Sequence, residues 1–365
     1  MTLEKDAVLK NSDNRLLEQA AQVLEERRKL GLEGLTGDLA FIMIQTEADR
    51  HEAAAAELLR YTGHDLVDAF VCGEEKTFVL RHPASADILV RTGRPGPNPF
   101  AEINSHPKSA HLPNTRLETL VFHCRDIEAY RDAQLERGVQ FLTDEIQEWG
   151  PCRFLQSRPS PYTGNSVGVV EFLGDTGRYR GDACADLPSS LSKPETPWAK
   201  AVSTLDHIAT RVRAEHRDPA ILEYMGLTNY SFAFAIYVPE LNSITNVARC
   251  GTARFAQVFT SGISVSGSGE GEGPTEAFVR NYGARVHHMA FLTEQIGEMD
   301  PALRRDGLEF LSDLVGSEED GIRQSFSAPS PNTLLVNEYI QRFGDFDGFF
   351  TQKNVTLLTE ASGRQ

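Results

Sequence analysis

Three stretches in the second half of the chain show the alternation of apolar side chains that is typical of a buried β-strand. They are residues 205–209, 285–293 and 334–340. Each places one polar side chain among apolar neighbours on the same face: His207, His288 and Glu338. A buried carboxylate needs a partner, because the burial of an unpaired charge is very costly. Two neutral imidazoles and one carboxylate make up the facial triad that binds non-haem Fe(II), so these strands are predicted to form the centre of the molecule.

The other histidines are not predicted as metal ligands, because a single histidine on an apolar face is by default a core residue. His287 alternates to the opposite face from His288, which predicts a packing or supporting residue rather than a ligand. His123 stands on an apolar strand and is expected to pack in the core. Six further histidines occur in helix or loop settings and are expected at the surface: His51, His64, His82, His106, His111 and His216.

The same order of elements recurs along the chain, with a strand, then a helix, then further strands. The four units begin near residues 39, 117, 204 and 285. A repeated unit of this kind buries its apolar face against a neighbouring copy. The pattern predicts an α+β fold in which four βαβββ modules pair into two open β-barrel-like domains, each curved around a cavity.

The first two units also match the last two in sequence. The matching segments are 126–144 with 295–313, and 165–172 with 332–339. This gapless alignment places Glu171 on Glu338, while Thr119 stands in the place of His288. We therefore expect a metal in the second pair of modules only.

The segments outside the repeat predict the domain boundaries. An amphipathic pattern over about residues 13–30 indicates a helix in an N-terminal extension, residues 1–35, which we expect to cover a domain edge rather than a partner subunit. The proline- and serine-rich stretch 185–200 is typical of a linker. The paired-module domains are then residues 36–184, without metal, and residues 201–365, with the metal site.

The composition restricts the class of partner. The 365 residues carry a formal net charge of −16, which argues against binding to nucleic acid or to anionic membrane surfaces. No segment approaches the length of a membrane span, and the N-terminus lacks the basic start and apolar run of a signal peptide. The five cysteines are dispersed without a CxxC pair, which predicts reduced thiols and a cytoplasmic location.

Three further features allow more than one interpretation. The glycine-rich stretch 266–273 lacks the GK[ST] of a phosphate-binding loop and is expected to be a plain loop. Gln324 shares a strand face with Ile322 and Phe326, so its amide needs a partner, either a substrate oxygen or a neighbouring strand. The aromatic stretch 345–350 either anchors the tail in the core or stacks on a substrate ring.

From residue 204 to the C-terminus the sequence resembles the 4-hydroxyphenylpyruvate dioxygenase family, within the vicinal oxygen chelate superfamily. The segments that carry the resemblance are Asp206-His207, 286–293, Gln324-Ser325-Phe326-Ser327, 337–342 and Gly348-Phe349. The resemblance implies Fe(II) as cofactor, held by His207, His288 and Glu338. It further implies that Gln324 contacts a 2-oxo acid substrate and that Phe349 stacks on the aromatic ring of this substrate.

The sequence departs from the family where the substrate would bind. The family has a Pro-x-Asn-Glu strand end, whose Asn helps to hold the substrate, where this chain has the glycine-rich stretch; Ser268 is the nearest equivalent. The helical insertion that the family carries between His288 and Glu338 is missing. We therefore expect a retained metal site with an altered substrate pocket.

The resemblance implies a dioxygenase that takes O2 and a 2-oxo acid, decarboxylates the acid oxidatively and hydroxylates the same molecule. Benzylic hydroxylation, as in hydroxymandelate synthase, or a specialised-metabolism reaction on another 2-oxo acid would use the same metal site. A metal-free protein that sequesters a small molecule is the alternative outside enzymes. A homodimer is an expectation from the family.

Overall fold

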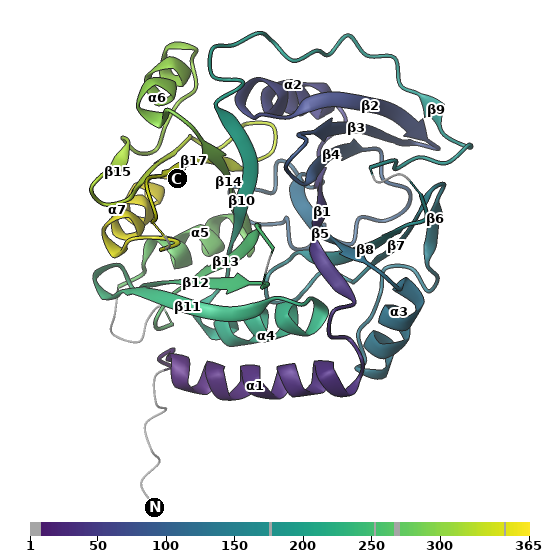
Figure 1. Cartoon of the computed structure of the whole chain (residues 1–365), viewed down its shortest axis with the longest axis horizontal. Helices are drawn as coiled ribbons and strands as arrows, with labels where there is room; N and C mark the ends of the chain where they lie inside the picture. Colours follow the sequence, from purple (N-terminus) through teal and green to yellow (C-terminus); the bar gives the residue numbers. More distant parts are fainter. Residues whose placement is uncertain (1–8, 175–176, 252, 266–270, 347) are drawn as a thin grey trace, which may run out of the picture.

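Two curled β-sheets, one from each half of the chain, form the framework of the molecule (Figure 1). The computed structural model describes residues 9–365, apart from 175–176, 252, 266–270 and 347. The described residues of the first half form a nine-stranded sheet in the order β6-β7-β8-β5-β1-β4-β3-β2-β9. Those of the second half form an eight-stranded sheet in the order β11-β12-β13-β10-β14-β17-β16-β15.

The first half consists of two modules and a short closing strand. The first module is β1 (Thr36–Gln45), α2 (His51–Tyr61), β2 (Asp65–Cys72), β3 (Glu75–Arg81) and β4 (Asp87–Thr92). The second module is β5 (Arg116–Cys124), α3 (Ile127–Glu136), β6 (Gln147–Trp149), β7 (Cys152–Gln156) and β8 (Ser166–Phe172). The closing strand β9 (Ala185–Asp186) pairs with β2.

The second half repeats this order with two added helices. The third module is β10 (Val202–Arg211), α4 (Arg217–Leu227), β11 (Ser231–Val238), β12 (Ser243–Arg249) and β13 (Ala256–Ser261), with the short 3-10 helices Ala214–His216 and Pro239–Leu241. The fourth is β14 (Arg285–Thr293), α6 (Ile296–Arg305), β15 (Val315–Ser317), β16 (Ile322–Phe326) and β17 (Val336–Arg342). Helix α5 (Pro274–Tyr282) precedes the fourth module and α7 (Gln352–Ser362) follows it. The predicted arrangement of paired βαβββ modules is confirmed.

The strand register corrects the predicted alignment of the two halves. Thr119 pairs with the first residue of β8, as His288 pairs with the first residue of β17, so these two positions do correspond. Glu338, however, corresponds to Gly168, because each lies two residues further along its strand. The placement of Glu171 on Glu338 is wrong by three residues. The segment Ser-x-Pro-Ser-Pro-x-Thr, present at 157–163 and at 327–333, marks the correct offset in the sequence itself.

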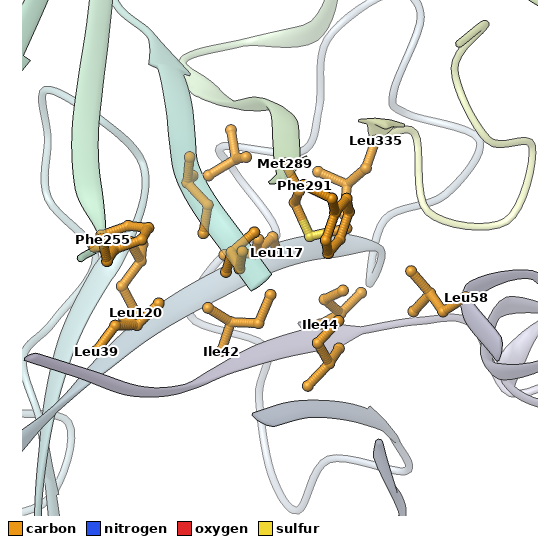
Figure 2. Packing of buried hydrophobic residues seen from close by; sticks show 14 of the residues in the cluster. Leu39, Ile42, Ile44, Leu58, Leu117, Leu120, Phe255, Met289, Phe291 and Leu335 are labelled. Carbon is orange, nitrogen blue, oxygen red and sulfur yellow. The ribbon is translucent and has the colours of Figure 1, made fainter. Parts of the chain in front are cut away.

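One apolar core joins the two halves. In β1, Ile42 and Ile44 belong to the same buried cluster as Met289 and Phe291 of β14, and Figure 2 shows these side chains facing one another. Because side chains alternate along a strand, the neighbouring residues of β1 point to the opposite face; Phe41 belongs to a separate cluster there. Each sheet therefore turns its outer face to the shared core and its inner face to its own cavity.

Helix α1 (Asp13–Lys29) packs on α4 and on the edge strand β11, below them in Figure 1. Leu16 is fully buried there, and the guanidinium of Arg27 donates to the carbonyl oxygen of Tyr230 at 2.9 Å. The helix therefore covers an edge of the second half. No helix in the described part of the chain has the length and apolar character needed to cross a membrane. The exact domain boundaries stay predictions.

Two predictions about single residue types are wrong. Cys72 and Cys184 form a disulfide, because the pairing of β9 with β2 brings two cysteines that are 112 residues apart into contact; Cys124, Cys152 and Cys250 are free. Among the histidines, His51 and His64 are buried rather than at the surface, and His123 is exposed rather than packed.

Candidate metal centre

The three predicted ligands meet at the centre of the second sheet. His207, His288 and Glu338 lie on the neighbouring strands β10, β14 and β17. The Oε2 atom of Glu338 is 3.0 Å from Nε2 of His207 and 3.2 Å from Nε2 of His288. All three side chains are buried, and they form the one cluster of three metal-binding side chains found among the described residues.

The spacing of these atoms is compatible with a metal bound between them. Nε2 of His207 is buried and has no hydrogen-bond partner in the described part of the chain, although Oε2 of Glu338 is close to it. Two ligand atoms each about 2.1 Å from a metal and at right angles to it lie about 3 Å apart. The donor set of two imidazoles and one carboxylate is also that of non-haem Fe(II) sites. The residues therefore fit a divalent transition metal.

A carboxylate orients the first imidazole. Nδ1 of His207 donates to Oδ2 of Asp206 at 2.8 Å, which leaves the lone pair of Nε2 pointing to the centre. The guanidinium of Arg342 holds Asp206 with two hydrogen bonds of 2.7 and 3.0 Å. A partner of this kind fixes the tautomer of a ligating histidine and raises its basicity.

The second imidazole is oriented by its neighbour His287. The register shifts where Ala209 pairs with His288 and Thr210 with Val286, so that His287 is the extra residue of a β-bulge. For this reason His287 does not face away from His288, as strict alternation predicts; the two Nδ1 atoms are 2.8 Å apart. If Nε2 of His288 binds a metal, its Nδ1–H donates to His287, whose Nε2–H then donates to Gln365 at 3.1 Å.

The carboxylate of Glu338 accepts a hydrogen bond from the amide of Gln324, which is itself held by the amide of Asn354. Nε2 of Gln324 on β16 donates to Oε1 of Glu338 at 2.5 Å. Nδ2 of Asn354 on α7 in turn donates to Oε1 of Gln324 at 2.9 Å. The amide of Gln324 thus finds its partners in the protein, and its contact with a substrate stays a prediction. Helix α7 is coupled to the metal ligands through this pair of hydrogen bonds.

The imidazole of His207 and the carboxylate of Glu338 shift each other's pKa values toward the charged forms. Burial alone would raise the pKa of the Glu338 carboxyl, but the imidazoles of His207 and His288 hold this pKa well below its ordinary value. Burial acts in the opposite direction on His207, yet Glu338 and Asp206 raise its pKa to about 9. The two imidazoles thus favour the ionised carboxylate, and a metal at Nε2 of His207 would take the place of any proton on that atom.

A small cavity of about 40 Å³ adjoins the ligands. Polar side chains on its wall are Arg211, Thr245, Thr260, Thr275, His288, Gln324, Glu338 and Thr359. Apolar side chains on its wall are Val258, Phe326, Phe350, Val355 and Leu358. Strands of the second sheet and α7 thus line one cavity, and two of the metal ligands, His288 and Glu338, form part of its wall.

The aromatic residues after β17 divide between core and cavity. Phe349 is buried in a cluster with Ala209 and Val258, and its ring centroid lies 5.3 Å from that of His207. Phe350 lines the cavity, with its centroid 5.1 Å from that of His207. Stacking of Phe349 on a substrate stays a prediction, whereas Phe350 and Phe326 are the aromatic residues on the cavity wall. Ser268 lies outside the described residues.

Sequence reasoning missed two residues, Asn354 and Arg211, and within the aromatic stretch 345–350 it named Phe349 rather than Phe350 for the substrate. Asn354 gives no local signal, because it acts from a C-terminal helix whose position depends on the whole fold. Arg211 does give one, since it stands four residues after His207 on the same strand and therefore on the same face.

The fold is shared with solved enzymes of related architecture. A triple mutant of 4-hydroxymandelate synthase from Streptomyces coelicolor matches with a TM-score of 0.63 and 20% identity, over 90% of this chain and 98% of that chain. A xylose isomerase-like TIM barrel/4-hydroxyphenylpyruvate dioxygenase fusion protein matches with a TM-score of 0.63 and 14% identity, over 96% of this chain and 57% of that chain. The Mn(II)-bound glyoxalase from Novosphingobium aromaticivorans matches with a TM-score of 0.50 and 13% identity, over 86% of each chain.

Comparison at the level of sequence finds neither a matching family model nor a matching curated protein. At identities of 13–20% the structural likenesses establish the fold. The chain therefore has the vicinal oxygen chelate fold, in the paired arrangement of the 4-hydroxyphenylpyruvate dioxygenase and hydroxymandelate synthase structures, as a divergent example.

Proposed function

We propose that the protein is an Fe(II)-dependent dioxygenase that oxidatively decarboxylates a 2-oxo acid and hydroxylates the same molecule. The observation that supports this most directly is the buried cluster of His207, His288 and Glu338, in which each ligand has its own supporting partner. The fold shared with hydroxymandelate synthase supports the same class of reaction.

In this proposal His207, His288 and Glu338 hold the iron, which supplies the binding and activation of O2. One oxygen atom of O2 enters the new carboxylate, the other forms a hydroxyl at a C–H bond of the same molecule, and CO2 leaves. The four electrons that reduce O2 come from the two bonds broken in the substrate, so no further reductant is needed. The protein orients the ligands through Asp206 and Gln324.

The cavity also has to exclude water. Its volume is about 40 Å³, where roughly 10–15 Å³ is needed to hold one water molecule, so it has room for a few waters at most. A 2-oxo acid therefore enters only when side chains of α7, such as Val355 and Leu358, move aside. Their return over the substrate, together with Phe350, would keep bulk water from the reacting atoms.

The substrate contacts of Gln324, Phe349 and Ser268 belong to this proposal as predictions, as do a cytoplasmic location and a homodimer. Hydroxylation of a benzylic carbon is the second candidate, and the likeness to 4-hydroxymandelate synthase favours it. Both reactions consume O2 and release CO2, so they differ in the product alone.

The test is metal analysis followed by O2 uptake. Protein purified anaerobically should bind one Fe(II) per chain, and a panel of aromatic and aliphatic 2-oxo acids should then identify one whose addition consumes O2 and releases CO2 in equal amounts. The position of the new hydroxyl distinguishes ring from benzylic hydroxylation. Protein that takes up no iron would instead favour a metal-free binding protein.

A further inference from the structure

Arg211 stands on the wall of the metal-site cavity without a partner among the described residues. It lies on β10, four residues after His207, and alternation places the two side chains on the same inner face of the sheet. The side chain is 5% exposed, and it lines the same cavity as His288 and Glu338. A positive charge is thus buried in the space where the substrate of the proposed reaction would bind.

The guanidinium has no hydrogen bond or ion pair with any described residue, and its Nη1 is a buried donor without an acceptor. Its stabilising contact is the ring of Phe278, whose centroid lies 4.7 Å from the guanidinium carbon. Burial lowers the pKa of Arg211 to about 9, and no carboxylate offsets this effect. A buried charge of this kind is costly unless a partner arrives.

Two threonines extend the site across the sheet. Thr260 on β13 pairs in register with Arg211, and Thr245 on β12 pairs in register with Thr260. Both threonines line the cavity, and the hydroxyl of Thr260 is buried without a partner in the described part of the chain. A guanidinium and a hydroxyl on adjacent strands form a set of donors suited to a carboxylate.

An arginine of the first sheet, by contrast, has a carboxylate partner within the protein. Arg91 on β4 occupies the position that corresponds to Thr260, since it pairs with Gln45 as Thr260 pairs with Arg211. Its side chain is 13% exposed, and Glu75 forms an ion pair with it. Arg91 thus has a carboxylate partner, whereas Arg211 has none among the described residues.

We propose that Arg211, with Thr260, binds a second carboxylate of the substrate, so that the substrate is a 2-oxo acid with an anionic group at its far end. This inference rests on the proposed function. At about 3.3 Å per residue, the α-carbons of His207 and Arg211 are about 13 Å apart along β10. The metal ligands would thus hold the 2-oxo acid end and Arg211 the opposite end of one small molecule.

The experiment compares two acids of equal length. 2-Oxoadipate and 2-oxohexanoate differ by the distal carboxylate, and their binding to the Mn(II)-loaded protein is measured by calorimetry, where no turnover intervenes. The wild-type protein should bind 2-oxoadipate about 10- to 100-fold more tightly. Arg211→Met should abolish this preference and Arg211→Lys should retain part of it, with Mn(II) affinity unchanged in both.

Arg91→Met is the matched control, because it removes an ion-paired arginine from the metal-free half. It should lower the melting temperature, since it leaves Glu75 unpaired, and should keep the preference for 2-oxoadipate. Arg211→Met should leave the melting temperature of the ligand-free protein nearly unchanged or raise it, since it removes a buried charge that has no hydrogen bond or ion pair and loses only the contact with the Phe278 ring. A marked loss of stability in Arg211→Met with unchanged selectivity would assign Arg211 a structural role and overturn the proposal.

The two proposals fail in different ways. Selective binding of 2-oxoadipate without O2 uptake by the Fe(II) protein, for any acid tested, would refute the dioxygenase and leave the anion site standing. O2 uptake with 2-oxo acids that lack a second anionic group, and equal affinity for the two probes, would refute the anion site alone. Binding of neither probe to the Mn(II)-loaded protein would refute the anion site, while the dioxygenase would still be decided by O2 uptake with the full panel of 2-oxo acids.

Discussion

The two sheets are built alike, yet their central strands carry different chemistry at corresponding positions. The registers of β1, β5 and β8 against those of β10, β14 and β17 define the counterparts. Each residue of the triad has a counterpart at the same register position of the first sheet. The counterparts are Phe41 for His207, Thr119 for His288 and Gly168 for Glu338. One half therefore has three ligands where the other has an aromatic ring, a hydroxyl and no side chain.

The inner face of the first sheet is packed in place of the metal. The ring of Phe41 lies against Tyr179, with centroids 4.8 Å apart, and close to Trp149. A Cβ atom on Gly168 would approach ring and methyl carbons of Phe154 and Val121 at 3.0 Å, closer than ordinary contacts. The same architecture thus stabilises its inner face either by aromatic packing or by polar residues around a metal, and one half does not convert into the other by a single change.

The largest expected effect separates Glu338 from Glu171. Glu338→Ala should abolish Fe(II) binding and turnover, because two imidazoles alone hold Fe(II) weakly and leave its charge uncompensated. Glu171→Ala should leave both within a few-fold, since that carboxylate is half-buried in an ion pair with Arg153 at 3.1 Å. Fe(II) titration and O2 uptake on both variants give the comparison. Equal loss in the two would mean that the metal does not belong to the second half alone.

A second prediction concerns Gly168→Glu, which restores the missing carboxylate of the first half. It should destabilise the protein by about 3 kcal/mol or more, through overpacking and an unpaired buried charge, and the iron content should remain one per chain. Urea unfolding and metal analysis measure the two effects. Gly174→Glu is the control, because this glycine is exposed and a Cβ atom added to it would meet no described atom within 4 Å. A second bound iron in Gly168→Glu would show that packing does not exclude the metal.

The difference between the halves is only partly accessible from the sequence. The alternation of side chains along short strands is enough to predict the triad, because it shows that one polar side chain of each strand lies on the inner face of the sheet. It fails at His287, where a bulge changes the face, and at Cys72, whose partner depends on the pairing of a two-residue strand. The correct counterpart of Glu338 requires the register, since a gapless alignment of residues 165–172 is three positions out.

The supporting amides provide a third, smaller contrast. Gln324→Ala removes the donor to Oε1 of Glu338 and should weaken Fe(II) binding by about 10- to 100-fold, the range typical of lost outer-shell partners. Gln156, on the corresponding strand β7, donates to the hydroxyl of Thr119 at 2.6 Å. Gln156→Ala should leave iron affinity unchanged. Competition with a calibrated chelator measures both, and an equal effect of the two would contradict a supporting role for Gln324.

The smallest effect tests the contact between the halves. His64 of the first half is fully buried, its Nε2 donates to the carbonyl oxygen of Ala86 at 3.0 Å, and its ring meets Phe291 of the second half edge to face. Burial lowers the pKa of His64 from 6.5 to about 4. The unfolded chain therefore binds a proton between these values that the folded chain does not, so stability is lost as the pH falls below about 6.5. At pH 5.5 the loss from this residue should be about 1 kcal/mol.

His64→Gln should remove this share of the pH dependence, because glutamine can donate to the same carbonyl oxygen but does not titrate. The measurement is urea unfolding of the metal-free protein at pH 8 and pH 5.5, so that proton competition at the metal ligands is the same in wild type and variant. His111→Gln, at an exposed position, is the control and should keep the wild-type difference between the two pH values. If His64→Gln keeps that difference as well, His64 is protonated in the folded protein, and the interface between the halves is wetter at this point than its burial indicates.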